Sequence, residues 1–302
     1  MNNRQFRALA QPYVVRDGRR FRLKSFDPAG PGASASQQGA KKFLKKSIAA
    51  LSDLQEKLYA QDRWGVLLIF QAMDAAGKDS AIKHVMSGID PKGCQVYSFK
   101  SPSSEELDHD FMWRTSKCLP ERGRIGIFNR SYYEETLVVR VHPEFLRNQK
   151  LPAELLTKNI WRERFQDINA FERYLSRNGY VIRKFFLNVS RAEQRRRFLE
   201  RLDRPEKNWK FSIGDLAARE RWRTYMTAYE DTIRATATPH APWVVIPGDD
   251  KKFARTVVAA AVIDALNSLK LVFPAIDDEQ KKDLTRARRL LKQETRRRST
   301  KS

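Results

Sequence analysis

The chain has 302 residues, of which 41% are hydrophobic, so it can bury one large core and is not disordered throughout. Its 58 Lys and Arg residues against 36 Asp and Glu residues give a formal net charge of +22, which indicates a polyanionic partner without distinguishing DNA, RNA and polyphosphate. The most apolar late stretch, 257–266, is too short for a membrane span of roughly 20 residues, and no secretory signal begins the chain, so we expect a cytoplasmic protein without membrane contact.

The first segment, 1–37, leads into PAGPGASASQQG and shows no hydrophobic periodicity, so we expect a flexible basic N-terminal arm. Apolar residues at helical spacing then predict an amphipathic helix over 41–63. The continuous apolar run 66–70 predicts the first buried strand, and a turn-rich loop and a helix over 78–87 follow it.

The same alternation continues to about residue 270. We expect strands at 95–99, 124–128, 181–189 and 243–246, and helices that begin at the capping-box serine Ser103 and span 132–142, 153–177, 190–203, 215–235 and 250–270. Strands separated by helices predict a doubly wound α/β fold with a five-stranded parallel sheet. This P-loop kinase domain would occupy 38–272, and the charged residues 273–302 would form a basic C-terminal extension with an accessory helix.

The segment FQAMDAAGKDS, 70–80, lies between a strand and a helix, where backbone N–H groups and a helix N-terminus can hold phosphate. Lys78 supplies a mobile ammonium, and Gly77 lets the chain approach phosphate oxygens closely. The match to the P-loop (Walker A) pattern is imperfect, because Ala72 replaces its first glycine and Asp79 replaces the Ser or Thr that would hold magnesium. An ordinary strand-to-helix turn is the alternative.

Asp74 supports the functional interpretation. A carboxylate beside a phosphate site repels its ligand unless a cation stands between them, so we expect Asp74 to bind magnesium or to pair with Lys78. Its alternative role is turn formation. The candidate phosphate- and nucleotide-binding residues of this loop are Ala75, Ala76, Gly77, Lys78, Asp79 and Ser80.

A second motif, IGIFNRSYYEE at 125–135, is an apolar strand that ends in polar residues, at the sheet edge where open α/β folds bind ligands. Asn129 stands where a Walker B Asp would lie and cannot neutralise a metal ion. Glu134 and Glu135 are the remaining carboxylates, although acidic residues also favour any helix N-terminus. Arg130, directly after the strand, is better placed for phosphate than for solvent.

The basic segment RAEQRRRFLERLDRPEKNWKFS, 191–212, begins as a helix in which Arg197, Arg201 and Arg204 follow one face. A proline then breaks the helix, and Lys207 follows in a loop. The pattern predicts a closing lid over about 201–214, whose arginines can stabilise charge on a transferring phosphoryl group. The alternative is a solvated charged face.

Together, FQAMDAAGKDS, IFNRSYYEE and RLDRPEKNWKFS resemble the phosphate loop, second motif and lid of the polyphosphate kinase 2 family, and the similarity covers about 41–270. The resemblance implies a thymidylate-kinase-like core that requires Mg²⁺, or Mn²⁺ in its place. It also implies reversible phosphoryl transfer between inorganic polyphosphate and adenine or guanine nucleotides, and a homo-oligomer, either dimer or tetramer. Asn129 departs from the Asp common in the family and resembles the branch that accepts both AMP and ADP.

Carried over by position, the resemblance assigns catalytic roles to Asp74, Lys78, Arg130, Glu134, Arg201 and Arg204. Asp74 and Glu134 would be metal ligands, and Asn129 and Lys207 would contact nucleotide or phosphate. The implied mechanism is direct in-line attack of a nucleotide phosphate on the end of the polymer.

Two rival functions remain. One is an ATP-dependent nucleoside monophosphate kinase, which would not need the excess of positive charge. The other is a P-loop nucleic-acid-binding protein. Against the second, the basic residues concentrate in the lid, and no nucleic-acid-binding motif occurs.

Overall fold

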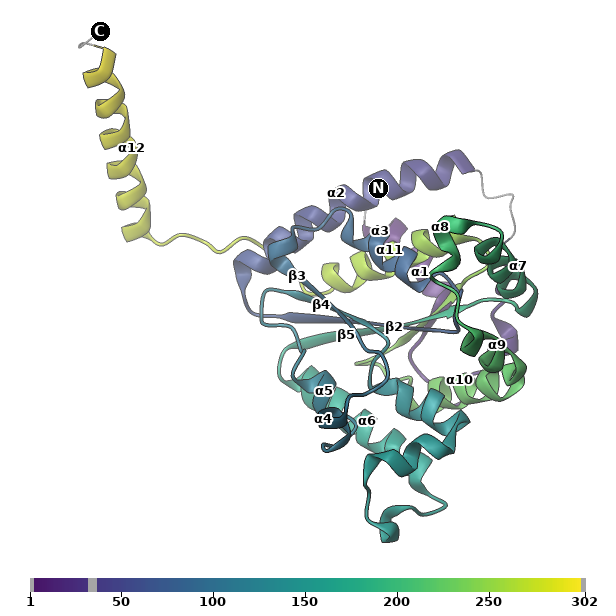
Figure 1. The fold of residues 1–302 in the computed structure, drawn as a ribbon. Helices are drawn as coiled ribbons and strands as arrows, with labels where there is room; N and C mark the ends of the chain where they lie inside the picture. The colour runs from purple at the N-terminus through teal and green to yellow at the C-terminus, as the bar shows by residue number, and fades with distance from the viewer. Residues whose placement is uncertain (1–2, 32–36, 300–302) are drawn as a thin grey trace. The chain divides into compact units, whose positions relative to one another are not determined.

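The structure is a computed structural model that describes residues 3–31 and 37–299. Contacts divide the chain into one unit that ends at Leu271 and a second that begins at Val272. The first unit contains a six-stranded sheet in the order β1-β6-β5-β2-β4-β3 (Figure 1). The strands are β1 (Val14–Val15), β2 (Gly65–Ala72), β3 (Cys94–Ser98), β4 (Ile125–Asn129), β5 (Tyr180–Asn188) and β6 (Trp243–Pro247).

The central strand is β2, which pairs in parallel with β4 on one side and β5 on the other. Its apolar run is buried along almost its whole length, as expected of a strand covered on both faces. Strands β3 and β6 extend the parallel pairing, but β1 joins β6 in antiparallel register. The sheet is therefore mixed and has six strands, which corrects the expected five-stranded parallel sheet. Two residues are too short a run for a periodic pattern to reveal β1.

Helices cover both faces of the sheet (Figure 1). The first unit contains α1 (Asn3–Ala10), α2 (Gln37–Gln61), α3 (Lys78–Met86), α4 (Ser104–Leu107), α5 (Trp113–Ser116), α6 (Ile160–Arg177), α7 (Arg191–Leu202), α8 (Pro205–Asn208), α9 (Ile213–Glu220), α10 (Trp222–Thr236) and α11 (Lys251–Asn267). Side chains of α2, α3 and α11 form one hydrophobic cluster with the sheet, and those of α6 and α10 form another on the opposite face.

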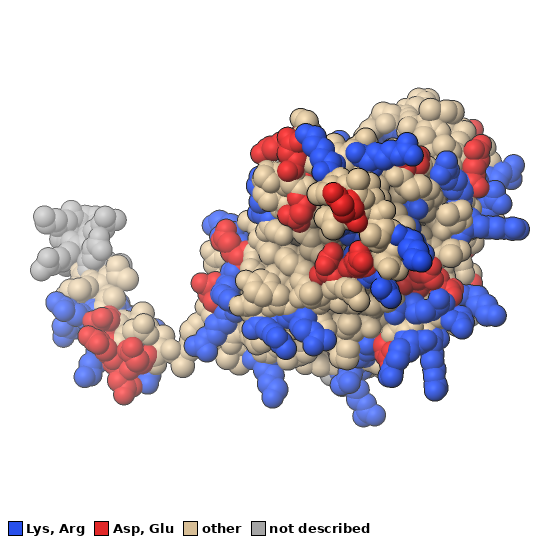
Figure 2. Space-filling model, turned by 90° about the horizontal axis from the view of Figure 1, so that it is seen from below, with Lys and Arg blue, Asp and Glu red and all other residues tan. Residues whose placement is uncertain are grey.

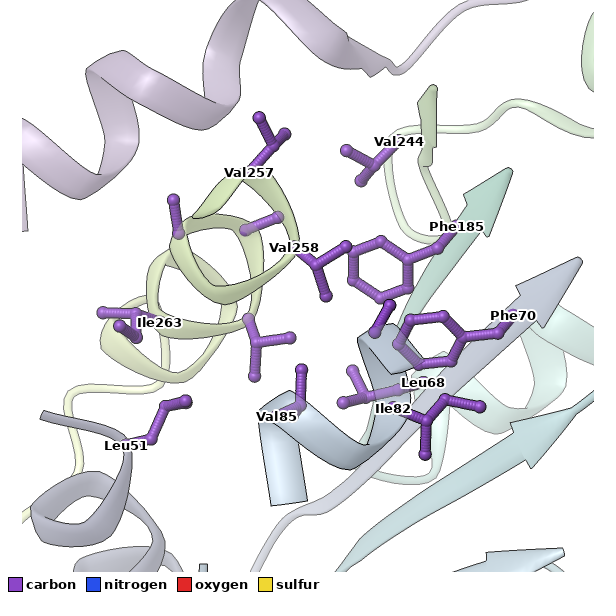
Figure 3. Packing of buried hydrophobic residues seen from close by; sticks show 14 of the residues in the cluster. Leu51, Leu68, Phe70, Ile82, Val85, Phe185, Val244, Val257, Val258 and Ile263 are labelled. Carbon is purple, nitrogen blue, oxygen red and sulfur yellow. The ribbon is translucent and has the colours of Figure 1, made fainter. Parts of the chain in front are cut away.

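The cluster under α11 shows why these segments pack. Phe70 of β2 and Phe185 of β5 stack with their ring centroids 4.7 Å apart. Figure 3 shows Val258 of α11 directed at these rings and Val85 of α3 lying toward Leu68 of β2. The central part of α11 is almost wholly apolar, so it is buried on nearly every side rather than along one stripe.

The N-terminal segment differs from the expected flexible arm. Among its described residues, Phe6 and Ala10 are buried in the core, α1 packs against α11, and β1 extends the sheet. Two apolar positions four residues apart are too few to predict such a helix from sequence. The parts of the expected arm at 1–2 and 32–36 lie outside the described residues.

Several expected helices also changed form. The segment after β4 is a short 3₁₀ turn, η4 (Tyr132–Glu134), followed by a π-helical turn, η5 (Glu135–Val139). The long helix expected from 215 is two helices, α9 and α10, which meet at Arg221. The other short turns are η1 (Gln11–Tyr13), η2 (Leu23–Ser25), η3 (Pro91–Gly93), η6 (Pro143–Gln149) and η7 (Ala153–Leu155).

The second unit consists of a short segment without regular secondary structure and α12 (Asp278–Ser299). Leu284, Leu290 and Leu291 of this helix are exposed. In the described parts of the chain, no helix is both long enough and apolar enough to cross a membrane.

Candidate active site

The loop between β2 and α3 has the backbone shape of an anion site. Ala75 and Gly77 both have positive φ, at 61° and 99°. A Cβ on Gly77 would meet nothing closer than 3.5 Å, so backbone conformation rather than lack of space calls for glycine there. Gly77 is the N-cap of α3 and no side chain caps the helix, so the first N–H groups of α3 remain open to a ligand.

Lys78 begins α3 and is partly buried. Within the described residues, its ammonium makes no hydrogen bond and no ion pair. Burial lowers the pKa of Lys78, the charge of Arg130 adds to that effect, and the carboxylates of Glu134, Asp74 and Asp79 oppose it. The side chain is therefore a cation without a close counter-ion, next to the open helix terminus.

Arg130 follows β4 with a φ of 64°. Its backbone N–H donates to the carbonyl of Phe70 at 3.0 Å, which ties the end of β4 to the end of β2. Its guanidinium donates to Asp74 Oδ1 at 3.0 Å and lies 3.5 Å from Glu134 Oε2. These carboxylates, Glu134 first, raise the pKa of Arg130 despite its burial. The structure thus brings three predicted catalytic side chains together.

Gln71, at the end of β2, is a site residue that sequence analysis missed. Its Nε2 donates to Glu134 Oε1 at 2.8 Å, while its buried Oε1 has no hydrogen-bond partner among the described residues. Its polar character in an otherwise apolar run was the available signal, but Glu134 is 63 residues away in sequence.

The oxygen atoms around Arg130 fit a magnesium ion. Asp74 and Glu134 offer carboxylates on the same guanidinium, and the unpartnered oxygen of Gln71 adds a neutral donor beside them. No group of three or more His, Cys, Asp or Glu side chains suited to a metal occurs in the described chain. Magnesium commonly takes only one or two protein carboxylates and completes its shell with water and substrate phosphate, so two carboxylates are within the usual number.

Other predicted ligands have local partners. Asn129 Nδ2 donates to Asp79 Oδ1 at 3.0 Å, so these two side chains satisfy each other. Ser80 Oγ accepts a hydrogen bond from Arg255. The side chains of Asp79 and Ser80 are therefore both engaged in hydrogen bonds with other side chains.

Arg197 has a role that the sequence did not predict. It is buried, and its guanidinium donates to the carbonyls of Ala75 and Ala76 at 3.1 and 2.7 Å. It also donates to the carbonyls of Gly248 and Asp249 at 2.6 and 2.9 Å. Arg197 therefore holds the phosphate loop and the β6–α11 loop in fixed relation, rather than forming part of a cationic lid face.

The remaining lid residues pair with carboxylates of α7 and α9. Arg201 lies 3.6 Å from Asp215, while Arg204 and Lys207 lie 3.6 and 2.6 Å from Glu200. In the described structure, none of these three basic residues bonds to Asp74, Arg130 or the phosphate loop. Burial, with the charge of Asp74 adding to its effect, raises the pKa of Asp215 at the start of α9.

A pocket of about 250 Å³ opens beside Arg130 and Glu134. The chain between β3 and β4 contributes Phe111 and Arg114 to its wall, and η6 contributes Phe145. Its mixture of aromatic and charged groups, close to the carboxylates, is typical of a small-molecule site. All of its lining residues lie within 100–149, but most of them fall outside the second motif, so that motif alone could not predict the pocket.

Comparisons with known proteins extend over most of the chain. The sequence model of the family "Polyphosphate kinase 2 (PPK2)" matches residues 34–273. The chain is 51% identical to an ADP-polyphosphate phosphotransferase of Rhodopseudomonas palustris, over 85% of this chain and 89% of that protein. It is 42% identical to an AMP/ADP-polyphosphate phosphotransferase of Meiothermus ruber, over 87% of this chain and 94% of that protein.

A solved structure shows the same arrangement. The structure superposes on the crystal structure of polyphosphate kinase 2 from Arthrobacter aurescens TC1 with a TM-score of 0.80 and 40% sequence identity. The match covers 90% of this chain and 94% of that one.

Proposed function

Because this chain belongs to the polyphosphate kinase 2 family, we propose that it transfers a phosphoryl group reversibly between polyphosphate and AMP or ADP at the site around Lys78. The chain is a polyphosphate-dependent nucleotide phosphotransferase. The relatives named above act on ADP, or on AMP and ADP, and on polyphosphate, which supports adenine nucleotides as acceptors and leaves guanine nucleotides to experiment.

The observation that carries the proposal is the ammonium of Lys78, which has no close counter-ion among the described residues and lies beside the open N-terminus of α3. Backbone N–H groups and this ammonium would hold the terminal phosphates of the polymer, and Arg130 would hold the phosphate in transfer. An oxygen of the nucleotide's terminal phosphate attacks the end phosphorus. A new P–O bond forms as the bridging P–O bond breaks, and a polymer one unit shorter leaves.

Asp74 and Glu134 would hold Mg²⁺, with Mn²⁺ as a substitute. The ion would neutralise negative charge on the transferring phosphate. Asn129 would act through Asp79, to which it donates a hydrogen bond, rather than as a metal ligand. Arg201, Arg204 and Lys207 would leave their present partners and turn toward the phosphates when the lid closes.

The acceptor nucleoside would occupy the pocket beside Glu134. Phe111 and Phe145 offer aromatic surface for a base, and Arg114 offers a cation for phosphate or ribose oxygens. This arrangement would place the nucleotide's phosphate next to Arg130. We also propose a homo-oligomer, a dimer or a tetramer, whose mass light scattering can measure.

The test is a product assay with purified protein, long-chain polyphosphate and either AMP or ADP, with Mg²⁺ or with excess EDTA. We expect ADP from AMP, or ATP from ADP, only when Mg²⁺ is present. Accumulation of either product at an undiminished rate in EDTA would refute metal dependence, and failure with both nucleotides would refute the proposed acceptors.

A further inference from the structure

A closed polar network lies in the core directly beneath the second motif. Glu172 of α6 and Lys184 of β5 form an ion pair of 2.6 Å, and both side chains are completely buried. The hydroxyls of Tyr132 and Tyr133 donate to Glu172 Oε1 at 2.9 and 2.8 Å. Lys184 also donates to the hydroxyl of Tyr133 and to the carbonyl of Thr236, at 2.9 and 2.8 Å.

Each strong hydrogen-bonding group of this network is used. The three N–H donors of Lys184 have three different acceptors, and each oxygen of Glu172 accepts at least one bond. Both tyrosine hydroxyls donate to the carboxylate of Glu172, and the hydroxyl of Tyr133 also accepts from Lys184. Fully satisfied buried networks of this kind restrict geometry strongly.

Stability alone does not account for the charges. A buried ion pair can often be replaced by apolar side chains of similar volume without loss of stability. The directions of the hydrogen bonds, in contrast, cannot be reproduced by apolar groups. The main effect of the network is therefore to fix the positions of neighbouring residues, rather than to add stability.

That neighbour is the turn η4, because Tyr132 and Tyr133 lie between Arg130 and Glu134 in the chain. Local hydrogen bonds also shape the turn: Ser131 Oγ accepts from the N–H of Tyr133, and the carbonyl of Ser131 accepts from the N–H of Glu134. Arg130 is held in a left-handed conformation that costs free energy for a side chain with a Cβ. The two tyrosine hydroxyls attach this turn to α6 and, through Lys184, to β5.

We propose that Glu172 and Lys184, acting through the hydroxyls of Tyr132 and Tyr133, are positioning residues that fix Arg130 and Glu134 for phosphoryl transfer. The proposal rests on the proposed function of the Lys78 site. It predicts that loss of the hydroxyls impairs the chemical step more than substrate binding or folding.

The first variant is Tyr132→Phe/Tyr133→Phe, which removes both anchors and leaves the Glu172–Lys184 pair in place. We expect kcat to fall at least tenfold at a temperature well below Tm, while the KM for the nucleotide changes less than threefold. Amide hydrogen exchange over 130–135 should become at least threefold faster. The control is Ile263→Val in the cluster of Figure 3, on the other face of the sheet, which should lower Tm and leave kcat within twofold.

The second variant, Tyr132→Phe/Tyr133→Phe/Glu172→Met/Lys184→Met, makes the whole network apolar. We expect it to recover the Tm of the wild type while kcat stays at least tenfold reduced, a separation that a purely structural role would not produce. Wild-type kcat and unchanged exchange over 130–135 in either variant would overturn the proposal. If the wild-type protein itself transfers no phosphate from polyphosphate, the proposed function fails, and the exchange result alone decides whether the network positions the turn.

Discussion

Arg130 is the residue on which the geometry of the site depends most directly. One guanidinium contacts the carboxylates of Asp74 and Glu134, which arise from two different strand ends. Because the planar fork of arginine can serve two acceptors in fixed directions, the side chain sets the relative positions of both proposed metal ligands. A lysine at this position would keep the charge but could not keep both contacts.

We therefore expect Arg130→Lys to lower kcat by about two orders of magnitude while Tm changes little. Steady-state assays with polyphosphate and ADP or AMP measure the first quantity, and thermal unfolding measures the second. Arg124→Lys is the matched control, because Arg124 pairs with Glu121 before β4 and away from the site. A variant Arg130→Lys with kcat within threefold of the wild type would contradict this role.

The ammonium of Lys78 predicts a pH dependence. Burial lowers its pKa below the ordinary 10.5, and transfer requires the protonated form, so kcat/KM should fall as the pH rises through this lowered pKa. Bound polyphosphate is negative and raises the pKa again, so the decline in kcat should lie at higher pH than the decline in kcat/KM. A pH profile of kcat and kcat/KM measures both declines.

The control is Lys78→Arg, whose residual activity should not decline with rising pH. A wild-type kcat/KM that stays flat up to pH 10.5 would contradict the role of the Lys78 ammonium.

Sequence reasoning identified site residues that belong to short motifs next to a strand. Asp74 was singled out in the phosphate loop and Arg130 and Glu134 in the second motif, and the resemblance to polyphosphate kinase 2 assigned them to one site; the structure brings their side chains together. Gln71 and Arg197 were missed because their roles depend on partners 63 and more than 100 residues away. The present pairing of Arg204 and Lys207 with Glu200 was also not predictable, since a charge pattern does not reveal which state of a lid is populated.

Helix α7 holds the phosphate loop in position, in addition to beginning the predicted lid. Arg197 of this helix bonds to four carbonyls in two loops and also pairs with Glu193 at 2.7 Å. Removal of the guanidinium would leave those buried carbonyls without this donor, while the carboxylate of Glu193 would keep its hydrogen bonds from Arg196. Such losses are among the large single-residue effects on stability.

We expect Arg197→Met to reduce the free energy of unfolding by about 3 kcal/mol and to weaken polyphosphate binding, because the loop that holds phosphate loses its support. Urea denaturation and isothermal titration measure the two effects. Arg196→Met is the control, since the neighbouring arginine is mostly exposed and its loss should cost less than about 1 kcal/mol. Equal decreases in the free energy of unfolding of the two variants would show that Arg197 does not hold the loop in position.

Elements with a continuous apolar run or a strong cap were predictable. The strands expected from residue 66 onward coincide with β2 to β6 within two residues, and Ser103 forms the predicted capping box of α4. Elements whose form depends on tertiary contacts were not. The 3₁₀ and π turns after β4 replace a regular helix where Tyr132 and Tyr133 turn into the core, and β1 exists only because β6 offers it an edge.

At the scale of the whole molecule, the net charge of +22 suits a polymer of phosphates better than a single nucleotide. Figure 2 shows lysine and arginine side chains spread over much of one face, with acidic groups between them. The positive field therefore extends well beyond the active site, and a long polyanion can contact several basic groups at once.

This predicts a difference in salt dependence. Raising the salt concentration should increase the KM for long-chain polyphosphate steeply, because many ion contacts are lost, and should increase the KM for ADP or AMP only slightly. Initial rates at several salt concentrations measure both slopes, and tripolyphosphate, which spans fewer contacts, is the control donor with a shallower slope. Equal slopes for the long polymer and tripolyphosphate would contradict binding along the surface.

The most direct test of the central claim is a comparison of phosphoryl donors in the wild type and in Lys78→Ala. The protein is supplied with Mg²⁺, AMP or ADP, and as donor either labelled polyphosphate or labelled ATP, and label in the nucleotide product is measured. The account predicts transfer from polyphosphate that falls by at least a hundredfold in Lys78→Ala. Transfer from ATP but not from polyphosphate would indicate an ordinary nucleotide kinase, and undiminished transfer in Lys78→Ala would place the reaction elsewhere in the molecule.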